Sequence, residues 1–101
     1  MPKQQKPMVV ITISTEEIRE LTLDELCSAC EVTPDFVADV IEQGVIEPLP
    51  DLRFNEEALR KVRTVLRLQQ DLEVNLPGAA LIIDLMDELE RLRKQLEILQ
   101  R

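Results

Sequence analysis

Residues 22–48, TLDELCSACEVTPDFVADVIEQGVIEP, carry the start and stop signals of two short helices joined by a tight turn. Thr22 and Glu25 form a capping box, in which each side chain accepts a hydrogen bond from the other residue's backbone N–H. Thr33 supplies a second cap, and Pro34 follows at the first helical position, where a missing N–H is tolerated. These signals predict a helix-turn-helix, a unit that usually reads DNA through its second helix.

Apolar residues follow helical spacing in both stretches, so each predicted helix has one face for the core. Those of the first helix are Leu23, Leu26, Cys27 and Cys30. Those of the second are Val37, Val40 and Ile41, with Phe36 at the border and Gly44 at the helix end. A chain of 101 residues with two aromatic side chains has to form one modest aliphatic core, and therefore a single, mostly helical domain.

The helix-turn-helix segment lacks basic residues. From position 20 to position 52 there is no Lys or Arg, and the nine acidic residues are Glu20, Asp24, Glu25, Glu31, Asp35, Asp39, Glu42, Glu47 and Asp51. The net charge of −8 resides in this segment, because residues 53–101 are balanced and residues 1–19 carry a charge of +1. Phosphate binding needs Lys and Arg, so this distribution opposes DNA binding and favours a basic protein partner.

The flanking residues predict a winged domain followed by a separate helix. Residues 1–7 are a polar lead-in without expected structure, and the alternating apolar residues of 8–14 predict a short strand. Residues 52–54 look like a wing strand, and Asn55 caps a third helix that extends to Val74. We expect its core residues to be Leu59, Val62, Val65 (or Leu66) and Leu68 (or Leu72). The spacing also predicts ion pairs Glu56–Arg60 and Glu57–Lys61.

Residues 75–78 (NLPG) predict a break before a last helix that reaches Arg101. That helix carries an apolar stripe at alternating spacings of three and four, formed by Ile82, Leu85, Leu89, Leu92, Leu96 and Leu99. The pattern is that of a coiled coil over about two and a half heptads. Little chain remains to cover the stripe, so a second copy of the helix is the expected cover, and folding back onto the domain is the alternative. We therefore expect a winged domain over 8–75 and a dimerisation helix over 76–101.

The order and spacing of several motifs resemble the MerR-type winged helix-turn-helix group. The matching segments are 22–26 (TLDEL), 32–34 (VTP), 42–46 (EQGVI) and 53–60 (RFNEEALR). Within that group the chain is most similar to the chaperone modulatory protein CbpM family. The features that carry this similarity, over residues 8–95, are GVIEP at 44–48, RFN at 53–55, VLRL at 65–68, LPG at 76–78 and LMDEL at 85–89.

The resemblance implies a non-enzymatic protein. Members of this family bind the J-domain of the DnaJ-like co-chaperone CbpA, block its work with the chaperone DnaK, and suppress its DNA binding. The expected partner of this chain is therefore a J-domain, and the alternative is a MerR-like transcription regulator that binds DNA.

The chain departs from the DNA-reading members at the positions that contact DNA. Asp35, Ala38 and Asp39 stand where those members have arginines and a tyrosine, and one bidentate arginine contact is worth roughly 1–3 kcal/mol of base discrimination. Glu31 replaces the usual turn glycine, at a cost of about 1 kcal/mol if its φ is positive. Arg53 of the wing is retained, which leaves one phosphate contact open.

The candidate partner-binding residues are Asp35, Asp39, Glu42, Glu31 and Arg53. The first three lie on the outer face of the second helix, where they form either a dock for a basic helix, such as helix II of a J-domain, or an ordinary solvated face. A solvated face usually mixes charge signs, which favours the dock. The bases of the third helix form a second charged patch, which we interpret as a solvated face balanced by nearby acids, with phosphate contact or pairing with other acids as alternatives: Arg60, Lys61, Arg63 and Arg67.

The sequence contains no pattern for catalysis or metal binding. Cys27 and Cys30 form the pair CSAC, but a structural zinc site needs four ligands and the chain has no His and no further Cys. Their place on an apolar stripe indicates small core residues rather than a redox dithiol. With no cofactor motif and no nucleophile–base pair, we expect a non-enzymatic protein without cofactors. The absence of a signal peptide and of a long apolar run predicts a cytoplasmic location.

Overall fold

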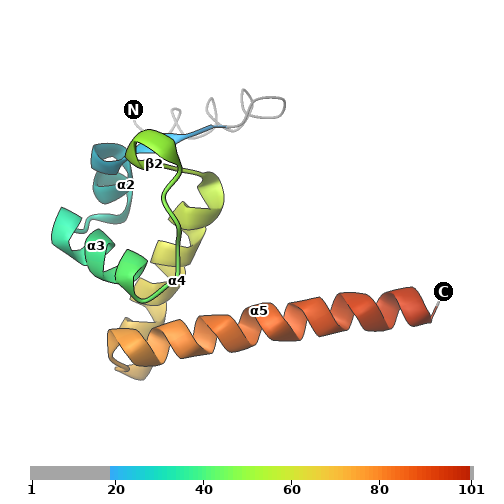
Figure 1. The fold of residues 1–101 in the computed structure, drawn as a ribbon. Coiled ribbons are helices and arrows are strands. Elements are labelled where there is room, and N and C mark those ends of the chain that lie inside the picture. Colours follow the sequence, from blue (N-terminus) through green and yellow to red (C-terminus); the bar gives the residue numbers. More distant parts are fainter. Residues whose placement is uncertain (1–18, 101) are drawn as a thin grey trace, which may run out of the picture.

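The computed structural model describes residues 19–100, so the predicted lead-in at 1–7 and the strand at 8–14 lie outside the described residues. Figure 1 shows a small, mainly helical domain from which a long final helix projects. Its elements are β1 (Leu21–Thr22), α2 (Leu23–Cys30), α3 (Pro34–Glu42), the 3-10 helix η1 (Pro50–Leu52), β2 (Arg53–Phe54), α4 (Glu56–Leu72) and α5 (Leu76–Leu99). The predicted fold class, a mainly α winged helix-turn-helix, is confirmed.

Both predicted caps of the helix-turn-helix are present. Thr22 N–H donates to Glu25 Oε1 over 2.9 Å, and Glu25 N–H donates to Thr22 Oγ1 over 3.1 Å, which completes the capping box. Thr33 Oγ1 accepts from Phe36 N–H at 3.1 Å at the start of α3. Between the helices, Glu31 adopts the left-handed conformation (φ 59°, ψ 48°). The turn therefore has the geometry for which glycine is the usual residue.

The wing is shorter than the sequence predicted. β1 and β2 pair antiparallel, with Leu21 opposite Phe54 and Thr22 opposite Arg53. Leu52, predicted to be in the strand, instead belongs to η1. The backbone φ values of Asp51 and Leu52 are +63° and +54°, which are incompatible with an extended ladder. The wing strand therefore begins at Arg53.

Helix α4 lies at the centre of the core. Ala58, Val62 and Val65 are buried on one face, as predicted for the two valines, while the small Ala58 was not predicted. Three further side chains of α4 pack against the core but are only partly buried: Leu59, Leu66 and Leu68. Leu72 is 58% exposed, so Leu68 is the correct choice of the two alternatives. Phe54 is fully buried and anchors the wing to this core.

The break predicted over residues 75–78 is shorter in the structure, because α5 already begins at Leu76. Asn75 caps α5 through its side-chain Oδ1, which accepts from Gly78 N–H at 2.8 Å, and Pro77 lies within the first helical turn. Proline fits there because the first N–H groups of a helix have no intrahelical acceptor. The chain reverses just before, where Glu73 at the end of α4 has a φ of 57°.

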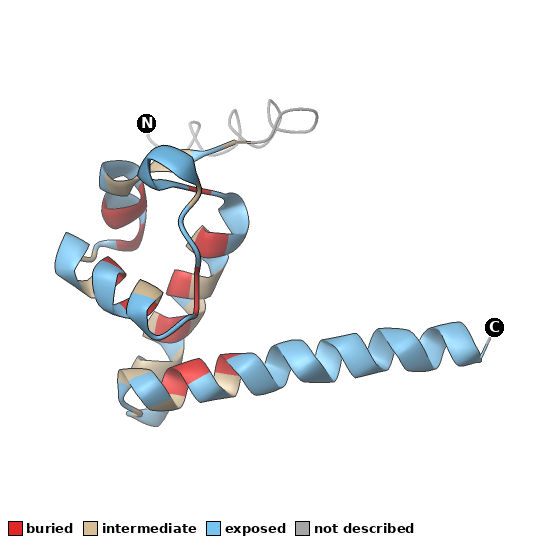
Figure 2. Cartoon of the chain, in the orientation of Figure 1, coloured by how far each residue is buried: buried red, intermediate tan, exposed pale blue. Residues whose placement is uncertain are grey.

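Only the first part of α5 packs on the domain. Ala79, Ala80 and Ile83 are buried against the core, and every residue from Asp84 to Gln100 is exposed (Figure 2). Apart from the ion pair of Asp87 with Lys61 of α4, this part of the helix extends into solvent. Within residues 19–100, no helix combines the length and the apolar character needed to cross a bilayer.

Replacing Glu31 with glycine should stabilise the domain. The left-handed conformation costs a residue with a Cβ about 1 kcal/mol that glycine does not lose. We expect Glu31→Gly to raise the free energy of unfolding in urea by about that amount. Gln43 at the end of α3 is a matched control because its φ is −77°. Gln43→Gly should bring no gain, and a loss of stability in Glu31→Gly would contradict the argument.

Candidate protein-binding face

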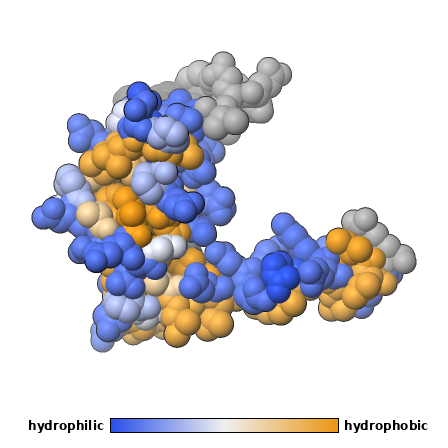
Figure 3. Space-filling model, in the orientation of Figure 1, coloured by the Kyte–Doolittle hydropathy of each residue, from blue (hydrophilic) through white to orange (hydrophobic). Residues whose placement is uncertain are grey.

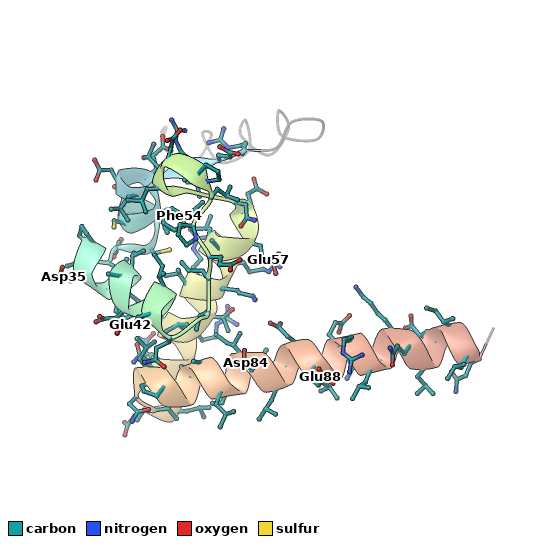
Figure 4. The ribbon with its side chains drawn as sticks, in the orientation of Figure 1. Asp35, Glu42, Phe54, Glu57, Asp84 and Glu88 are labelled. Atoms are coloured by element: carbon teal, nitrogen blue, oxygen red, sulfur yellow. The ribbon has the colours of Figure 1, made fainter. Side chains whose placement is uncertain are left out.

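The outer face of α3 is acidic. Asp35, Asp39 and Glu42 are all exposed, on the side of the helix opposite the buried Val37 and Val40. In Figure 4, Asp35 and Glu42 point away from the body of the domain. We refer to Asp35, Asp39 and Glu42 as the acidic face.

The charges of the acidic face are not compensated within the described chain. Every described ion pair involves α4 or α5, and none involves α2 or α3. The last turn of α3 contains no basic residue, although the negative end of the helix dipole would favour one there. The three carboxylates therefore leave an attractive potential for a cationic surface.

Apolar side chains border the acidic face. Val32, Phe36 and Ile41 are only partly buried and pack against the edge of the core. A partner that lies on α3 can therefore cover apolar surface next to the carboxylates. This combination is typical of protein interfaces, in which apolar contacts supply affinity and charges supply orientation.

The structure brings only part of the predicted partner-binding set together. Glu31 is exposed in the turn that leads into α3, next to the beginning of the acidic face. Arg53 is also exposed, but it lies on β2, where its backbone bonds to Leu49. Arg53 is thus a wing residue and does not share the surface of α3.

The basic residues of α4 fall into two groups. Arg60, Arg63 and Arg67 are exposed on the outer side of the helix, and Arg63 Nη2 donates to the carbonyl oxygen of Ala29, 3.5 Å away, at the end of α2. Lys61 faces α5 instead, with its Nζ 3.1 Å from Asp87 Oδ2 and 3.8 Å from Glu57 Oε2.

Of the two predicted ion pairs in this helix, Glu57–Lys61 is present. Glu56–Arg60 is absent from the ion pairs of the described residues. The longer-range contact of Lys61 with Asp87 was not predicted.

Cys27 and Cys30 are buried core residues with free thiols. Burial raises the pKa of both thiols; the Asp24 carboxylate raises that of Cys27 further, whereas Arg63 opposes the rise at Cys30. Residues 19–100 contain no group of three His, Cys, Asp or Glu side chains placed to hold a metal ion. The interpretation of these cysteines as core residues is confirmed by their burial.

The apolar stripe of α5 is exposed and faces away from the domain. Ala80 and Leu89, like Ile83 and Leu92, are nine residues apart, which is two and a half helical turns. The buried residues and the stripe therefore lie on opposite sides of one continuous helix. Figure 3 shows hydrophobic side chains along the edge of α5 that is remote from the rest of the domain. Ile82 is half-buried, and the exposed members of the stripe are Leu85, Leu89, Leu92, Leu96 and Leu99.

The helix-turn-helix, the short wing and the protruding final helix define a winged helix-turn-helix protein whose second helix displays carboxylates. Residues 21–101 match the family described as "MerR HTH family regulatory protein". The chain is also 29% identical over 97 residues to the chaperone modulatory protein CbpM of Coxiella burnetii, with 92% of each chain covered. It is 31% identical over 93 residues to the protein of that name in Pseudomonas putida strain GB-1, which covers 88% of this chain and 92% of the relative.

The chain therefore belongs to the MerR helix-turn-helix family and, within it, to the family of chaperone modulatory proteins CbpM.

Both thiols should be unreactive in the folded protein. The thiolate is the reactive form, and burial both raises the pKa of Cys27 and Cys30 and blocks access. We expect labelling by a colorimetric disulfide reagent at neutral pH to be about a hundredfold slower than in urea-unfolded chain. Rapid labelling of either thiol without loss of helical signal would contradict their assignment to the core.

Proposed function

We propose that this chain is a non-enzymatic chaperone modulator that binds the J-domain of a DnaJ-like co-chaperone related to CbpA. Binding would inhibit the action of that co-chaperone with DnaK and its DNA binding. The name of the relatives supports a role in chaperone modulation. The observation that carries the proposed partner is the acidic face, whose exposed carboxylates form no ion pair within the described residues.

The dimensions of the acidic face suit a basic helix. Asp35 and Glu42 are seven residues apart, a rise of about 10 Å along α3. A partner helix with bases on one side presents charges at the same spacing, so two or three ion pairs can form along one line. The surface proposed to dock here is the basic surface of J-domain helix II, which the resemblance identifies as the part that DnaK engages. Its occupation by α3 would exclude DnaK.

Duplex DNA is a poorer partner for α3. The acidic face occupies the positions through which this fold normally contacts bases and phosphates, and phosphate repels carboxylate. Arg53, which is exposed on the wing, is the one base that the sequence retains for a phosphate contact there. A single arginine does not offset three carboxylates, which favours the protein-binding function.

We further propose that the segment 76–101, which contains α5, dimerises with a second copy and that residues 8–75 form the partner-binding domain. The stripe of α5 lies opposite the side that packs on its own domain. Covering it by folding back would require a break in a helix that runs continuously from Leu76 to Leu99. A second α5 covers the same leucines with both helices intact.

Reversing two charges of the acidic face should weaken J-domain binding. We expect Asp35→Lys with Asp39→Lys to lower the affinity measured by calorimetry about tenfold or more, because attraction becomes repulsion. Asp71→Lys with Asp84→Lys is a matched control, since both residues are exposed and lie outside α3. The control should bind as the unmodified protein does. Equal affinity of the two double variants, with unchanged helical content, would refute the role of the acidic face.

The oligomeric state tests the role of α5. At about 100 μM, sedimentation should show a dimer, and Leu92→Glu should shift it to monomer because the change introduces charge into the apolar seam. Ile98 serves as the matched control, because its side chain is 59% exposed but lies outside the apolar stripe. Ile98→Glu should leave the dimer intact. A monomeric unmodified protein at this concentration would refute the proposed dimer.

A further inference from the structure

An open hollow of about 550 Å³ lies where the end of α3, the following loop and the first half of α4 meet. Gly44 borders it with a φ of +81°, and a Cβ built there would meet no atom within 4 Å. The hollow is therefore open at this point. Its apolar lining is formed by Ile41, Val45, Ile46, Pro48, Leu49 and Ala58.

The charged groups of the hollow are predominantly acidic. Glu47 and Glu57 line it and are exposed, and neither is buried by the core. Lys61 also lines it, but its ammonium is engaged by Asp87 at 3.1 Å and by Glu57 at 3.8 Å. Among the lining residues, two carboxylates and one ammonium leave a net charge of −1. Glu47 forms no ion pair with any described residue.

The hollow begins just after the acidic face along the chain. Glu42 is the last residue of α3, and Gly44 at the edge of the hollow follows it by two positions. A basic helix that extends past Glu42 in the direction of α3 would reach the hollow at one end. The apolar lining of the hollow, together with its charge, would then determine the position of that end of the partner helix.

We propose that the hollow receives one lysine or arginine side chain of the basic helix that docks on α3. Its aliphatic stem would lie on the lining around Ile41 and Leu49, and its cationic head would meet Glu47 and Glu57. Long basic side chains combine an apolar stem with a charged end, which matches this arrangement of walls and carboxylates. The inference rests on the proposed function and adds the anchor that fixes the register of the partner.

An anchored cation contributes more to affinity than the other ion pairs of the interface. The pairs along α3 stay open to solvent, where an ion pair contributes little to affinity. A side chain seated in a hollow is partly removed from water, as are the anchors that dominate interface energetics. The hollow is therefore the point at which a single substitution should have the largest effect.

Glu47→Lys tests the anchor directly. With the J-domain as the probe, we expect an affinity about tenfold weaker by calorimetry than for the unmodified protein. Asp71→Lys brings the same change of charge at an exposed position outside the hollow, and it should have less than a twofold effect. Equal affinities of these two variants would overturn the inference.

Gly44→Asn provides a second variant that does not alter charge. Asparagine tolerates positive φ, and its side chain would add bulk at the edge of the hollow without meeting another atom at its Cβ. We expect weaker J-domain binding with unchanged helical content.

Amide NMR signals of Gly44, Glu47 and Leu49 in the unmodified full-length protein should shift on addition of the J-domain. Unshifted signals at all three positions, despite binding, would also overturn the inference.

The same measurements separate this inference from the proposed function. If the J-domain binds but neither variant weakens it, the proposed function stands and the anchor is refuted. If the J-domain does not bind at all, the proposed function fails. The hollow is then probed with a helical peptide that carries one lysine between leucines, and absence of shifts at Gly44 and Glu47 would refute the anchor as well.

The chain's own amino-terminal segment is the competing occupant, since it carries Lys3 and Lys6. Lys3→Glu with Lys6→Glu in the full-length protein should leave the signals of the hollow unchanged in the absence of partner. Shifts of Gly44 and Glu47 in that variant would assign the hollow to the segment and overturn the proposal.

Discussion

The packing of one helix face determines this structure. Ala58, Val62 and Val65 of α4 are buried together, and α2, the wing and α5 all contact this helix. Burial of one such valine contributes about 1.5–3 kcal/mol, a large part of the stability of a small domain. Because the chain has only two aromatic residues, this core depends on close aliphatic packing around Phe54. The acidic face of α3 is presented rigidly because its inner side, Val37 and Val40, belongs to the same core.

The features that could be predicted from the sequence are those with a local physical cause. The capping box of Thr22, the cap at Thr33 and the apolar periodicity of α2 and α3 involve neighbours within one or two helical turns. The sequence predicted strain at Glu31 if its φ were positive, and the observed φ is 59°. The assignment of Cys27 and Cys30 to the core followed from the same periodicity.

The wrong predictions arose where one local signal has two meanings. Pro77 and Gly78 can break a helix or occupy its first turn, and only the cap by Asn75 decides between these. Leu52 has strand-like neighbours, but its φ of 54° depends on the turn at η1.

Long-range contacts escaped prediction altogether. Lys61 and Asp87 are 26 residues apart, and the hollow combines three segments, so neither has a sequence signature. The acidic face was predictable because it lies on one helix.

The position of the leucine stripe on α5 has a consequence for valency. In a dimer formed through that stripe, each winged domain lies on the far side of its own α5, so the two domains project in opposite directions. Neither acidic face is covered, and the faces do not compete for space. Such an assembly is bivalent, and a partner that itself carries two copies of the bound domain would meet the second site at an effective concentration set by the length of the paired helices. The affinity between two dimers would then exceed that of a single domain pair without any additional contact.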